Sequence, residues 1–530
     1  MYQNSIDHIK AIGDVIADSV SKNIFPVETN DRILDIEKID KLSLSDIYDN
    51  SFNINKHLDA KLKGRDLTVP MKATLVLKDK KTNKIIDRKR VTLIDQPIMT
   101  NRGSFIYGGN DYHMVNQLRL KPGVYTRVKE NGEVESFFNL SKGGASGFSI
   151  WMDPESGKIN FKIGGKNPSL YATMKALDVS DAELEAKWGK ELLDLNKLSD
   201  KQLNNDISKI YNSLYRSKAD PNADINTMKS EIKNFFDNTG ISEETTKITL
   251  GKSFDKVTPE LLLRSSDKLI KVSKNEEEPD ERDALEFKNV FSVEDLISAR
   301  INAKAREAKF KIKNNLNSKD SISDIYSKEI LNKPIRSFMT QSSLSTSSDQ
   351  TNPLAMVNAM TRVTPMGEGG ISSLDIITTS MRSVSDSHAG ALDPTQTPES
   401  KRIGINLNLT GSARVEDREI KVPLIDIKTG KESYKTKLET HESYVAFPDQ
   451  YDIKNKKFNF PKVRAIYKGK TVETAPENIN YIIRDASDLF SIGTNLIPFV
   501  ADVQGNRTML PIKCQDRQFR LQIVRRRWCR

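Results

Sequence analysis

Few side chains in this 530-residue chain are spaced for catalysis. The five histidines, at positions 8, 57, 113, 388 and 441, lie far apart, and none belongs to an H-E-x-x-H zinc pair. The sequence has no G-x-x-x-x-G-K-[ST] phosphate loop and no D-x-D-x-D cluster for paired magnesium ions. A lone histidine such as His388 is typical of a hydrogen-bonded structural residue. The chain alone therefore lacks a complete catalytic site.

Groups suited to phosphate are present instead. Arg507 offers a planar fork of fixed-charge donors that suits a nucleotide phosphate. Three glycines at 367, 369 and 370 suit a close approach of another group to the backbone, because glycine has no Cβ. Arg300 and Lys304 lie among the basic residues of a helix expected over 292–313. The alternatives are a surface ion pair, an ordinary turn and a solvated helix face.

The net charge of +10 is unevenly distributed. Residues 510–530 contain seven bases and one acid, so +6 lies in this tail, together with both cysteines, Cys514 and Cys529. The rest of the chain is nearly neutral and free of cysteine, which excludes a disulfide framework or a cysteine-bound zinc there. The overall charge therefore identifies no partner.

Length and hydropathy set the class of protein. No apolar run approaches the ~18–20 residues of a membrane span, and the polar N-terminus lacks a signal-peptide core. We expect a soluble, intracellular protein of several domains, with an α+β multidomain fold.

The elements that must position these groups follow from the apolar pattern. A helix is expected near residues 6–20. Strands are expected near 75–77 and 91–94 around a turn at 80–83, and at 104–107 and 112–115 around a turn at 108–111. A further aromatic strand is expected at 148–151. Residues 165–250 read as helical, with a capping box at 180–183 and a helix stop at 238–240.

The later half alternates between helix, loop and strand. The acidic run 276–283 predicts a solvated hinge, and the serine-rich stretch 342–349 a loop. Residues 406–473 predict strands with charged hairpin tips. The helix over 292–313 has an apolar stripe with steps of three or four residues: Val293, Ile297, Ile301, Ala305, Ala308 and Ile312.

Three motifs in this half resemble the β subunit of multisubunit RNA polymerases. Residues 349–354 read D-Q-T-N-P-L and residues 367–370 read G-E-G-G, where the family has D-Q-x-N-P-L and then L-G-P-G-G. Residues 387–404 contain S-H-A-G, T-P-E and I-G, and are similar to the family's T-H-Y-G-R-x-C-P-I-E-T-P-E-G-P-N-I-G. Residues 491–499, S-I-G-T-N-L-I-P-F, with N-R at 506–507, resemble V-G-x-S-L-I-P-F and a later N-R.

Two more motifs lie upstream in the same order. Residues 97–124 are similar to the family's P-L-M-T-x-x-G-T-F and S-Q-L-x-R-S-P-G-V, and residues 331–335 to I-N-x-K-P. Five motifs in order over about 65–509 make the resemblance specific. The departures and the length are most like the split β subunits of giant bacteriophages.

The resemblance implies a domain plan. Residues 1–147 and 280–338 would form the protrusion, and 148–275 an inserted lobe. Residues 339–410 would form the fork region, and 411–509 a β-rich segment leading towards the active-centre barrel.

The resemblance also implies site residues. Asn506 and Arg507 would lie beside the incoming nucleotide. Gln117, Arg119, Arg300 and Lys304 would face the DNA channel. The fork and its link would place these residues near nucleic acid: Asp349, Gln350, Asn352, Pro353, Arg362, Gly367, Gly369, Gly370, His388, Thr397, Pro398 and Glu399.

In this family the catalytic Mg²⁺ is bound by the β′ subunit, so this chain is expected to bind no metal itself. Expected partners are β′-like subunits, a C-terminal β-like chain, a promoter-specificity factor, DNA template, RNA and NTPs. The expected location is the bacterial host cytoplasm during infection, or alternatively the virion. The rival interpretation is a non-enzymatic phage structural or nucleic-acid-packaging protein.

Two motifs depart from the family pattern. In the rifampicin-contact stretch, T-H-K-R-R is replaced by residues 358–362, N-A-M-T-R, and Q-F-M-D by residues 346–349, T-S-S-D. The drug pocket thus loses a histidine and a phenylalanine, which predicts resistance. The E-T-P-E-G-P-N motif reads Q-T-P-E-S-K-R at 396–402, so roles tied to its first acid or its asparagine do not transfer.

The tail at 510–530 breaks the resemblance. Back-translation from Lys513 and a one-base shift permit codons for M-S-R-Q-A-V-P and then E-A-P-L-V, which the family has at this point. The alternatives are a change of reading frame and a real basic tail in which Trp528 stacks on nucleic-acid bases. We favour the frame change, and the nucleotide sequence decides between them.

Overall fold

The computed structural model describes residues 2–141, 147–215, 219–220, 223–347, 352–452, 455–500, 503–504 and 507–508. The chain divides into two compact units, and both mix helices and sheets, as the α+β multidomain prediction requires. Unit 1 comprises residues 1–119 and 289–530, and unit 2 comprises Leu120–Lys288. Among the described residues, no helix is long and apolar enough to cross a membrane.

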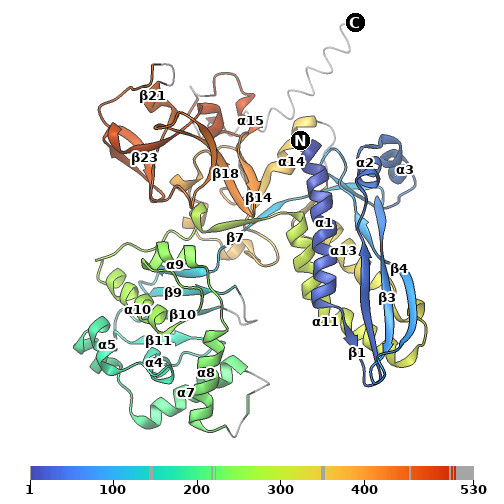
Figure 1. Cartoon of the computed structure of the whole chain (residues 1–530). Coiled ribbons are helices and arrows are strands. Elements are labelled where there is room, and N and C mark those ends of the chain that lie inside the picture. Colours follow the sequence, from blue (N-terminus) through green and yellow to red (C-terminus); the bar gives the residue numbers. More distant parts are fainter. Residues whose placement is uncertain are drawn as a thin grey trace. The chain divides into compact units, whose positions relative to one another are not determined.

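The first part of unit 1 contains three helices and a four-stranded antiparallel sheet of order β1-β2-β3-β4 (Figure 1). The elements are α1 (Tyr2–Asn23), β1 (Val27–Glu28), β2 (Arg32–Asp40), α2 (Leu44–Phe52), α3 (Ile54–Leu62), β3 (Thr68–Asp79), β4 (Ile85–Pro97), β5 (Phe105–Tyr107), β6 (Asn110–Met114) and β7 (Asn116–Leu120). Both expected hairpins, β3–β4 and β5–β6, are confirmed.

The return of the chain into unit 1 completes its core. This part contains β12 (Lys288–Phe291), α11 (Val293–Ser318), α12 (Ile322–Ile325), α13 (Glu329–Gln341) and β13 (Ser345–Ser347). The whole apolar stripe expected on α11 is buried. On α1, Ile9, Ile12, Ile16 and Val20 repeat at helical spacing and are fully buried.

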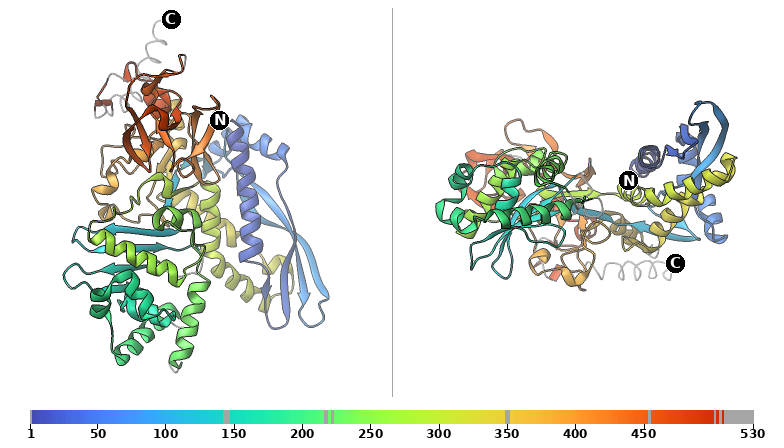
Figure 2. Two further views of the ribbon diagram at one scale, coloured as in Figure 1. Left: turned by 60° about the vertical axis from the view of Figure 1, so that its left-hand side comes forward. Right: turned by 90° about the horizontal axis from the view of Figure 1, so that it is seen from below.

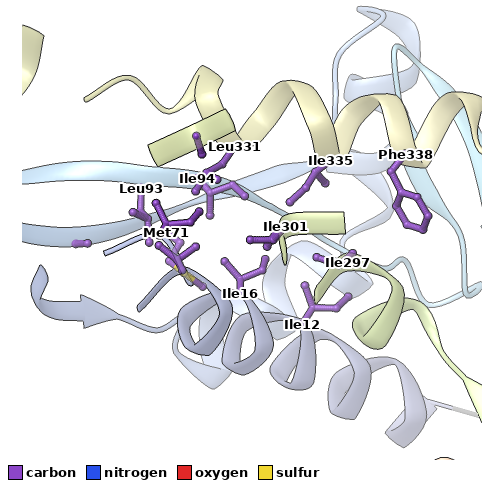
Figure 3. Packing of buried hydrophobic residues seen from close by; sticks show 14 of the residues in the cluster. Ile12, Ile16, Met71, Leu93, Ile94, Ile297, Ile301, Leu331, Ile335 and Phe338 are labelled. Carbon is purple, nitrogen blue, oxygen red and sulfur yellow. The ribbon is translucent and has the colours of Figure 1, made fainter. Parts of the chain in front are cut away.

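Helices α1 and α11 lie side by side although their contacting residues are about 280 positions apart in sequence (Figure 2). Polar contacts join them along their length: Ser19 Oγ lies 2.9 Å from Ser298 Oγ, and Asn23 Nδ2 donates to Asn302 Oδ1 at 2.7 Å. Figure 3 shows residues of both helices converging with residues of β3, β4 and α13 in one apolar core. The labelled residues are Ile12, Ile16, Met71, Leu93, Ile94, Ile297, Ile301, Leu331, Ile335 and Phe338.

The serine-rich stretch expected to be a loop contains a short strand. Residues 345–347 form β13, which pairs antiparallel with β6, with Thr346 opposite His113. Pairing with the free edge of a hairpin overrides the low strand propensity of serine.

The rest of unit 1 consists of short strands and turns. A five-stranded sheet has the order β12-β7-β14-β16-β15, and a seven-stranded sheet follows, as the strands expected over 406–473 require. The elements are α14 (Pro353–Thr361), β14 (Arg362–Thr364), β15 (Leu392–Asp393), β16 (Leu407–Leu409), β17 (Arg414–Glu416), β18 (Glu419–Asp426), β19 (Glu432–Thr436), β20 (Tyr444–Ala446), β21 (Tyr451–Asp452), β22 (Lys457–Phe458), β23 (Val463–Tyr467), β24 (Lys470–Thr474), β25 (Ile479–Ile483) and α15 (Ile492–Asn495).

Unit 2 is an antiparallel sheet of order β11-β10-β9-β8 with helices α4 to α10. Its aromatic core includes Phe138 and Phe148, whose ring centroids lie 4.5 Å apart, and Phe236 edge-on to Phe148. The elements are β8 (Gly123–Val128), β9 (Val134–Asn139), β10 (Phe148–Met152), β11 (Ile159–Lys162), α4 (Leu170–Ala176), α5 (Asp181–Trp188), α6 (Lys190–Asn196), α7 (Asp200–Tyr215), α8 (Ile225–Asp237), α9 (Glu243–Leu250) and α10 (Pro259–Ser273).

Local signals in unit 2 are confirmed. The capping box of Ser180 and Glu183 starts α5, and α8 ends at Asn238. Strands β8 and β9 belong to the same sheet, because β9 pairs with both β8 and β10.

The acidic run 276–283 is not uniformly solvated. Asp280 is almost buried, and its carboxylate accepts from Lys268 Nζ at 2.7 Å and from the Thr126 N–H at 2.8 Å. Burial raises the pKa of Asp280, against the opposing effect of Lys268. The solvated hinge predicted for 276–283 is wrong at Asp280, because its partners Lys268 and Thr126 lie outside this acidic run.

Candidate functional site

Strand pairing brings the upstream and fork motifs together in unit 1. Strand β7 runs parallel to β14, with Val363 opposite Asn116 and Thr364 opposite Gln117. The chain leaves β14 into residues 365–371, which contain all three motif glycines and are called the glycine loop here. This pairing therefore sets the glycine loop against the side chains of β7.

The glycine loop is a tight turn that excludes Cβ atoms. The Gly367 N–H donates to Ile371 O at 3.0 Å and the Ile371 N–H to Pro365 O at 2.9 Å. Gly367 and Gly369 have φ values of +108° and +81°, in the region that favours glycine. A Cβ on Gly369 would lie 2.8 Å from the Arg119 guanidinium carbon, and one on Gly370 would strike the Pro365 carbonyl oxygen.

Gln117 and Arg119 hold this loop through its carbonyl groups. Gln117 is fully buried, and its Nε2 donates to Met366 O at 2.8 Å. Arg119 donates from Nε to Gln117 Oε1 at 2.7 Å and from Nη2 to Glu368 O at 2.8 Å. Its guanidinium also stacks 4.4 Å from the ring centre of Phe291, and burial lowers the pKa of Arg119. Gln117 is therefore buried beneath the glycine loop, and a substitution of Gln117 would affect a bound ligand by changing the position of the loop.

Two further arginines lie close to Glu368 or to Phe291. Arg300 of α11 has Nη1 3.3 Å from Glu368 Oε1, and Arg418 lies 5.1 Å from the Phe291 ring centre. Arg418 is paired with Asp295 at 2.6 Å. Burial raises the pKa of Asp295, although the bond to Arg418 opposes this shift. We call Arg119, Arg300 and Arg418 the arginine cluster.

Lys304 does not join the arginine cluster. Its Nζ lies 3.0 Å from Glu307, which also pairs with Lys311 at 2.7 Å. These two lysines hold the pKa of Glu307 at about 2. On the same helix Phe310 is 65% exposed, between Arg306 and Lys313, which are also exposed. This face of α11 is therefore basic and carries one exposed aromatic ring.

A buried carboxylate joins the second and third motifs. Asp393 is fully buried, and its Oδ1 accepts from the N–H and hydroxyl of Thr395 at 2.8 and 2.6 Å. Its Oδ2 accepts from the Ser491 N–H at 2.8 Å and the Thr494 hydroxyl at 2.5 Å. Residues 387–404 and 491–499, about 100 positions apart, are therefore held together at one acid.

The other expected link residues lie in the same stretch of chain. His388 is buried at the end of a short 3-10 turn, Asp386–His388. The Thr397 hydroxyl accepts from the Gly404 N–H at 2.8 Å. Pro398 is partly buried and Glu399 is exposed.

The fork residues before the glycine loop shape helix α14. Asn352 is buried and caps it, since its Oδ1 accepts from the Leu354 N–H at 2.9 Å, and the helix begins at Pro353. Arg362 follows the helix as the first residue of β14, and burial lowers its pKa. Asn358 in the rifampicin-contact stretch offers its carbonyl oxygen to Asn408 Nδ2 at 2.8 Å.

The remaining expected site residues are Arg507 and several that lie outside the described residues. Arg507 is exposed in a short turn, where its N–H donates to Gln504 O at 2.8 Å. Asp349, Gln350 and Asn506 lie outside the residues that the structure describes, as do residues 510–530. In the described ranges no group of three or more His, Cys, Asp or Glu residues is placed to hold a metal ion.

Sequence reasoning missed Glu368, Phe291, Arg418 and Asp393. The first three each contact Arg119 or its stacking partner: Arg119 donates to the Glu368 carbonyl and stacks on Phe291, and Arg418 lies over the same ring. These contacts join separate strands and loops, so no local pattern reveals them. Asp393 had one weak signal, since an Asp-Pro pair such as 393–394 favours a turn.

Comparisons with a family model and with known proteins both point to RNA polymerase. The family described as RNA polymerase Rpb2, domain 3, matches residues 346–415, which include the glycine loop and Asp393. The chain is 25% identical over 518 residues to the DNA-directed RNA polymerase subunit beta of Pyropia yezoensis, covering 87% of this chain and 45% of that protein.

Two other relatives carry the same name. The protein of Thermosynechococcus vestitus is 26% identical over 480 residues, 84% of this chain and 42% of the relative. That of Phaeodactylum tricornutum is 29% identical over 273 residues, 50% of this chain and 19% of the relative. The chain thus spans less than half the length of these relatives. Over most of its own length it is a distant homologue of the β subunit of DNA-directed RNA polymerase, a nucleotidyltransferase subunit.

Proposed function

We propose that this chain is the N-terminal part of the β subunit of a phage-type multisubunit RNA polymerase. It transcribes DNA into RNA only after assembly with β′-like and C-terminal β-like chains. The β′-like subunit binds the catalytic Mg²⁺, and a promoter-specificity factor directs the complex to DNA. The assembly works in the bacterial host cytoplasm during infection, or is packaged in the virion.

One observation carries this proposal. The glycine loop, which has the family's fork pattern, is fastened by Gln117 and Arg119, which belong to a second family motif about 250 residues upstream. Two motifs that resemble one family separately also fit together as one packed feature. An unrelated packaging protein would have no reason to keep both halves of this contact.

The domain roles follow from the same homology. Residues 1–147 and 280–338 act as the protrusion, 148–275 as the lobe, 339–410 as the fork and 411–509 as the β-rich segment towards the active centre. The exposed cations of α11 support contact of the returning protrusion with DNA phosphates. Phage origin is supported by the departures from the family motifs at 358–362 and 396–402.

Co-purification tests the proposal. The tagged chain is isolated from infected cells and its partners are identified by mass spectrometry. The complex is then assayed for Mg²⁺-dependent incorporation of NTPs on a DNA template. We expect a partner with the magnesium-binding aspartates and RNA synthesis that stops on chelation of Mg²⁺. A complex of capsid proteins without RNA synthesis would instead support the packaging function.

A further inference from the structure

Glu368 stands out in the glycine loop because it replaces a proline of the family pattern. Its side chain is 77% exposed, and its carboxylate oxygens lie 3.3 and 3.4 Å from Arg300 Nη1. Charge-assisted bonds between guanidinium and carboxylate are normally about 2.7–2.9 Å long. The carboxylate is therefore near Arg300 but loosely held.

Arg300 has bonding capacity that Glu368 does not use. Its side chain is only 20% exposed, and its Nε is buried with no hydrogen-bond partner among the residues that the structure describes. A guanidinium offers five N–H donors in a planar fork, and oxyanions commonly take two of them together. An anion with several oxygens could satisfy Arg300 better than this one carboxylate does.

The loop backbone and the Glu368 side chain are held independently. Arg119 anchors the Glu368 carbonyl oxygen at 2.8 Å, and Gln117 anchors that of Met366. The exposed carboxylate can therefore swing away without dismantling the loop. When the Glu368 carboxylate moves away, Arg300 loses its paired acid. Within the arginine cluster, Arg418 keeps its ion pair with Asp295.

The geometry points to Glu368 as an internal phosphate mimic, whose carboxylate covers Arg300 until a backbone phosphate of bound nucleic acid displaces it. This inference rests on the proposed function and adds a control to the same fork region. Nucleic acid is the expected source of the phosphate because the adjoining face of α11 is also basic, with Arg306 and Lys313 exposed along it. An extended polyanion can contact both places, whereas a single small anion cannot.

DNA binding by the purified full chain tests the inference. Fluorescence anisotropy measures the affinity for a short labelled DNA duplex at several salt concentrations. Glu368→Gln is expected to tighten binding about two- to fivefold, the range for removal of an exposed competing charge pair. Glu329→Gln is the matched control, because Glu329 is exposed in unit 1, has the same charge and is not paired with an arginine among the described residues.

A double-mutant cycle assigns the effect to Arg300. In an Arg300→Gln background, confirmed as folded by its thermal transition, Glu368→Gln should change the affinity no more than Glu329→Gln does. Equal gains for the two glutamate variants, or a Glu368→Gln gain that survives without Arg300, would overturn the inference.

A competition arm separates nucleic acid from free phosphate compounds. Because Glu368→Gln is expected to bind DNA more tightly, tripolyphosphate should displace DNA from it no more readily than from Glu329→Gln. Stronger competition at Glu368→Gln, with no gain in DNA affinity, would exclude the nucleic-acid source. If the wild-type complex synthesises RNA but the double-mutant cycle shows no coupling between Glu368 and Arg300, only the phosphate-mimic inference is refuted. If no polymerase partners co-purify, the proposed function is refuted.

Discussion

Removal of the Asp393 carboxylate should open the contact between the second and third motifs. In Asp393→Ala the hydroxyls can pair with each other, since Thr494 Oγ1 lies 3.1 Å from Ser491 Oγ and 3.3 Å from Thr395 Oγ1. The N–H groups of Thr395 and Ser491 lose their acceptor. At about 1–3 kcal/mol for each buried unpaired donor, the local cost is about 2–6 kcal/mol.

Hydrogen exchange read by mass spectrometry measures this cost where it arises. Peptides covering 387–397 and 488–497 should exchange about 30-fold or more faster in the variant, while peptides of unit 2 serve as the internal reference. Asp393→Asn should have a smaller effect, because the amide oxygen still accepts from one pair of donors but its NH₂ faces the other pair.

Asp485→Ala is the matched control. Asp485 also accepts from the N–H two residues later, at 2.8 Å from Ser487 N, but it is exposed, so water can replace it. Its cost should stay below about 1 kcal/mol. The reasoning would be refuted if Asp393→Ala and Asp485→Ala gave the same exchange in both segments.

Four further outcomes are expected. Gly369→Ala should lower stability and weaken DNA binding by the chain, because its Cβ displaces the Arg119 guanidinium from the glycine loop; unchanged melting and anisotropy would contradict this. His8 pairs with Glu294 at 3.0 Å; burial opposes the shift, but the hydrogen bond and charge of Glu294 prevail and raise the pKa of His8. This pair should therefore stabilise unit 1 fully below about pH 6.5 and lose that contribution as the pH rises through the folded-state pKa of His8. Urea titrations at several pH values measure the free energy of unfolding, and this fall with pH should be missing in His8→Gln. Transcription by the assembled enzyme should persist at rifampicin concentrations that stop a bacterial polymerase, and complete inhibition would count against the altered drug-contact stretch. Arg507→Ala should raise the apparent KM for NTPs or slow their incorporation in the complex, and unchanged kinetics would remove Arg507 from the nucleotide site.

Local patterns predicted the elements well where a single element carries the signal. The apolar stripe of α11 and the turn at 80–83 are visible in sequence because the residues that create them are neighbours on one helix or in one hairpin. The buried Asp280 and the strand β13 were missed because their partners, Lys268 and β6, lie outside the segments that seemed to decide them.

The candidate site shows the same division. Its glycines were visible as a cluster, and family motifs identified Gln117 and Arg119. That these residues touch one another depends on the parallel pairing of β7 with β14, which joins positions about 250 residues apart. Glu368 differs from the family's proline in sequence, but its pairing with Arg300 of α11 depends on the tertiary fold and had no local signal.

The discontinuous core of unit 1 has a consequence for synthesis on the ribosome. Helix α1 emerges early, but the α11 face that covers it is translated only after the whole of unit 2. During that interval Ile9, Ile12 and Ile16 lack their final cover, while unit 2 is contiguous in sequence and can complete its own core. A nascent chain stalled near residue 288 should therefore expose the apolar face of α1 to chaperones and proteases, and protection should begin once α11 has left the exit tunnel.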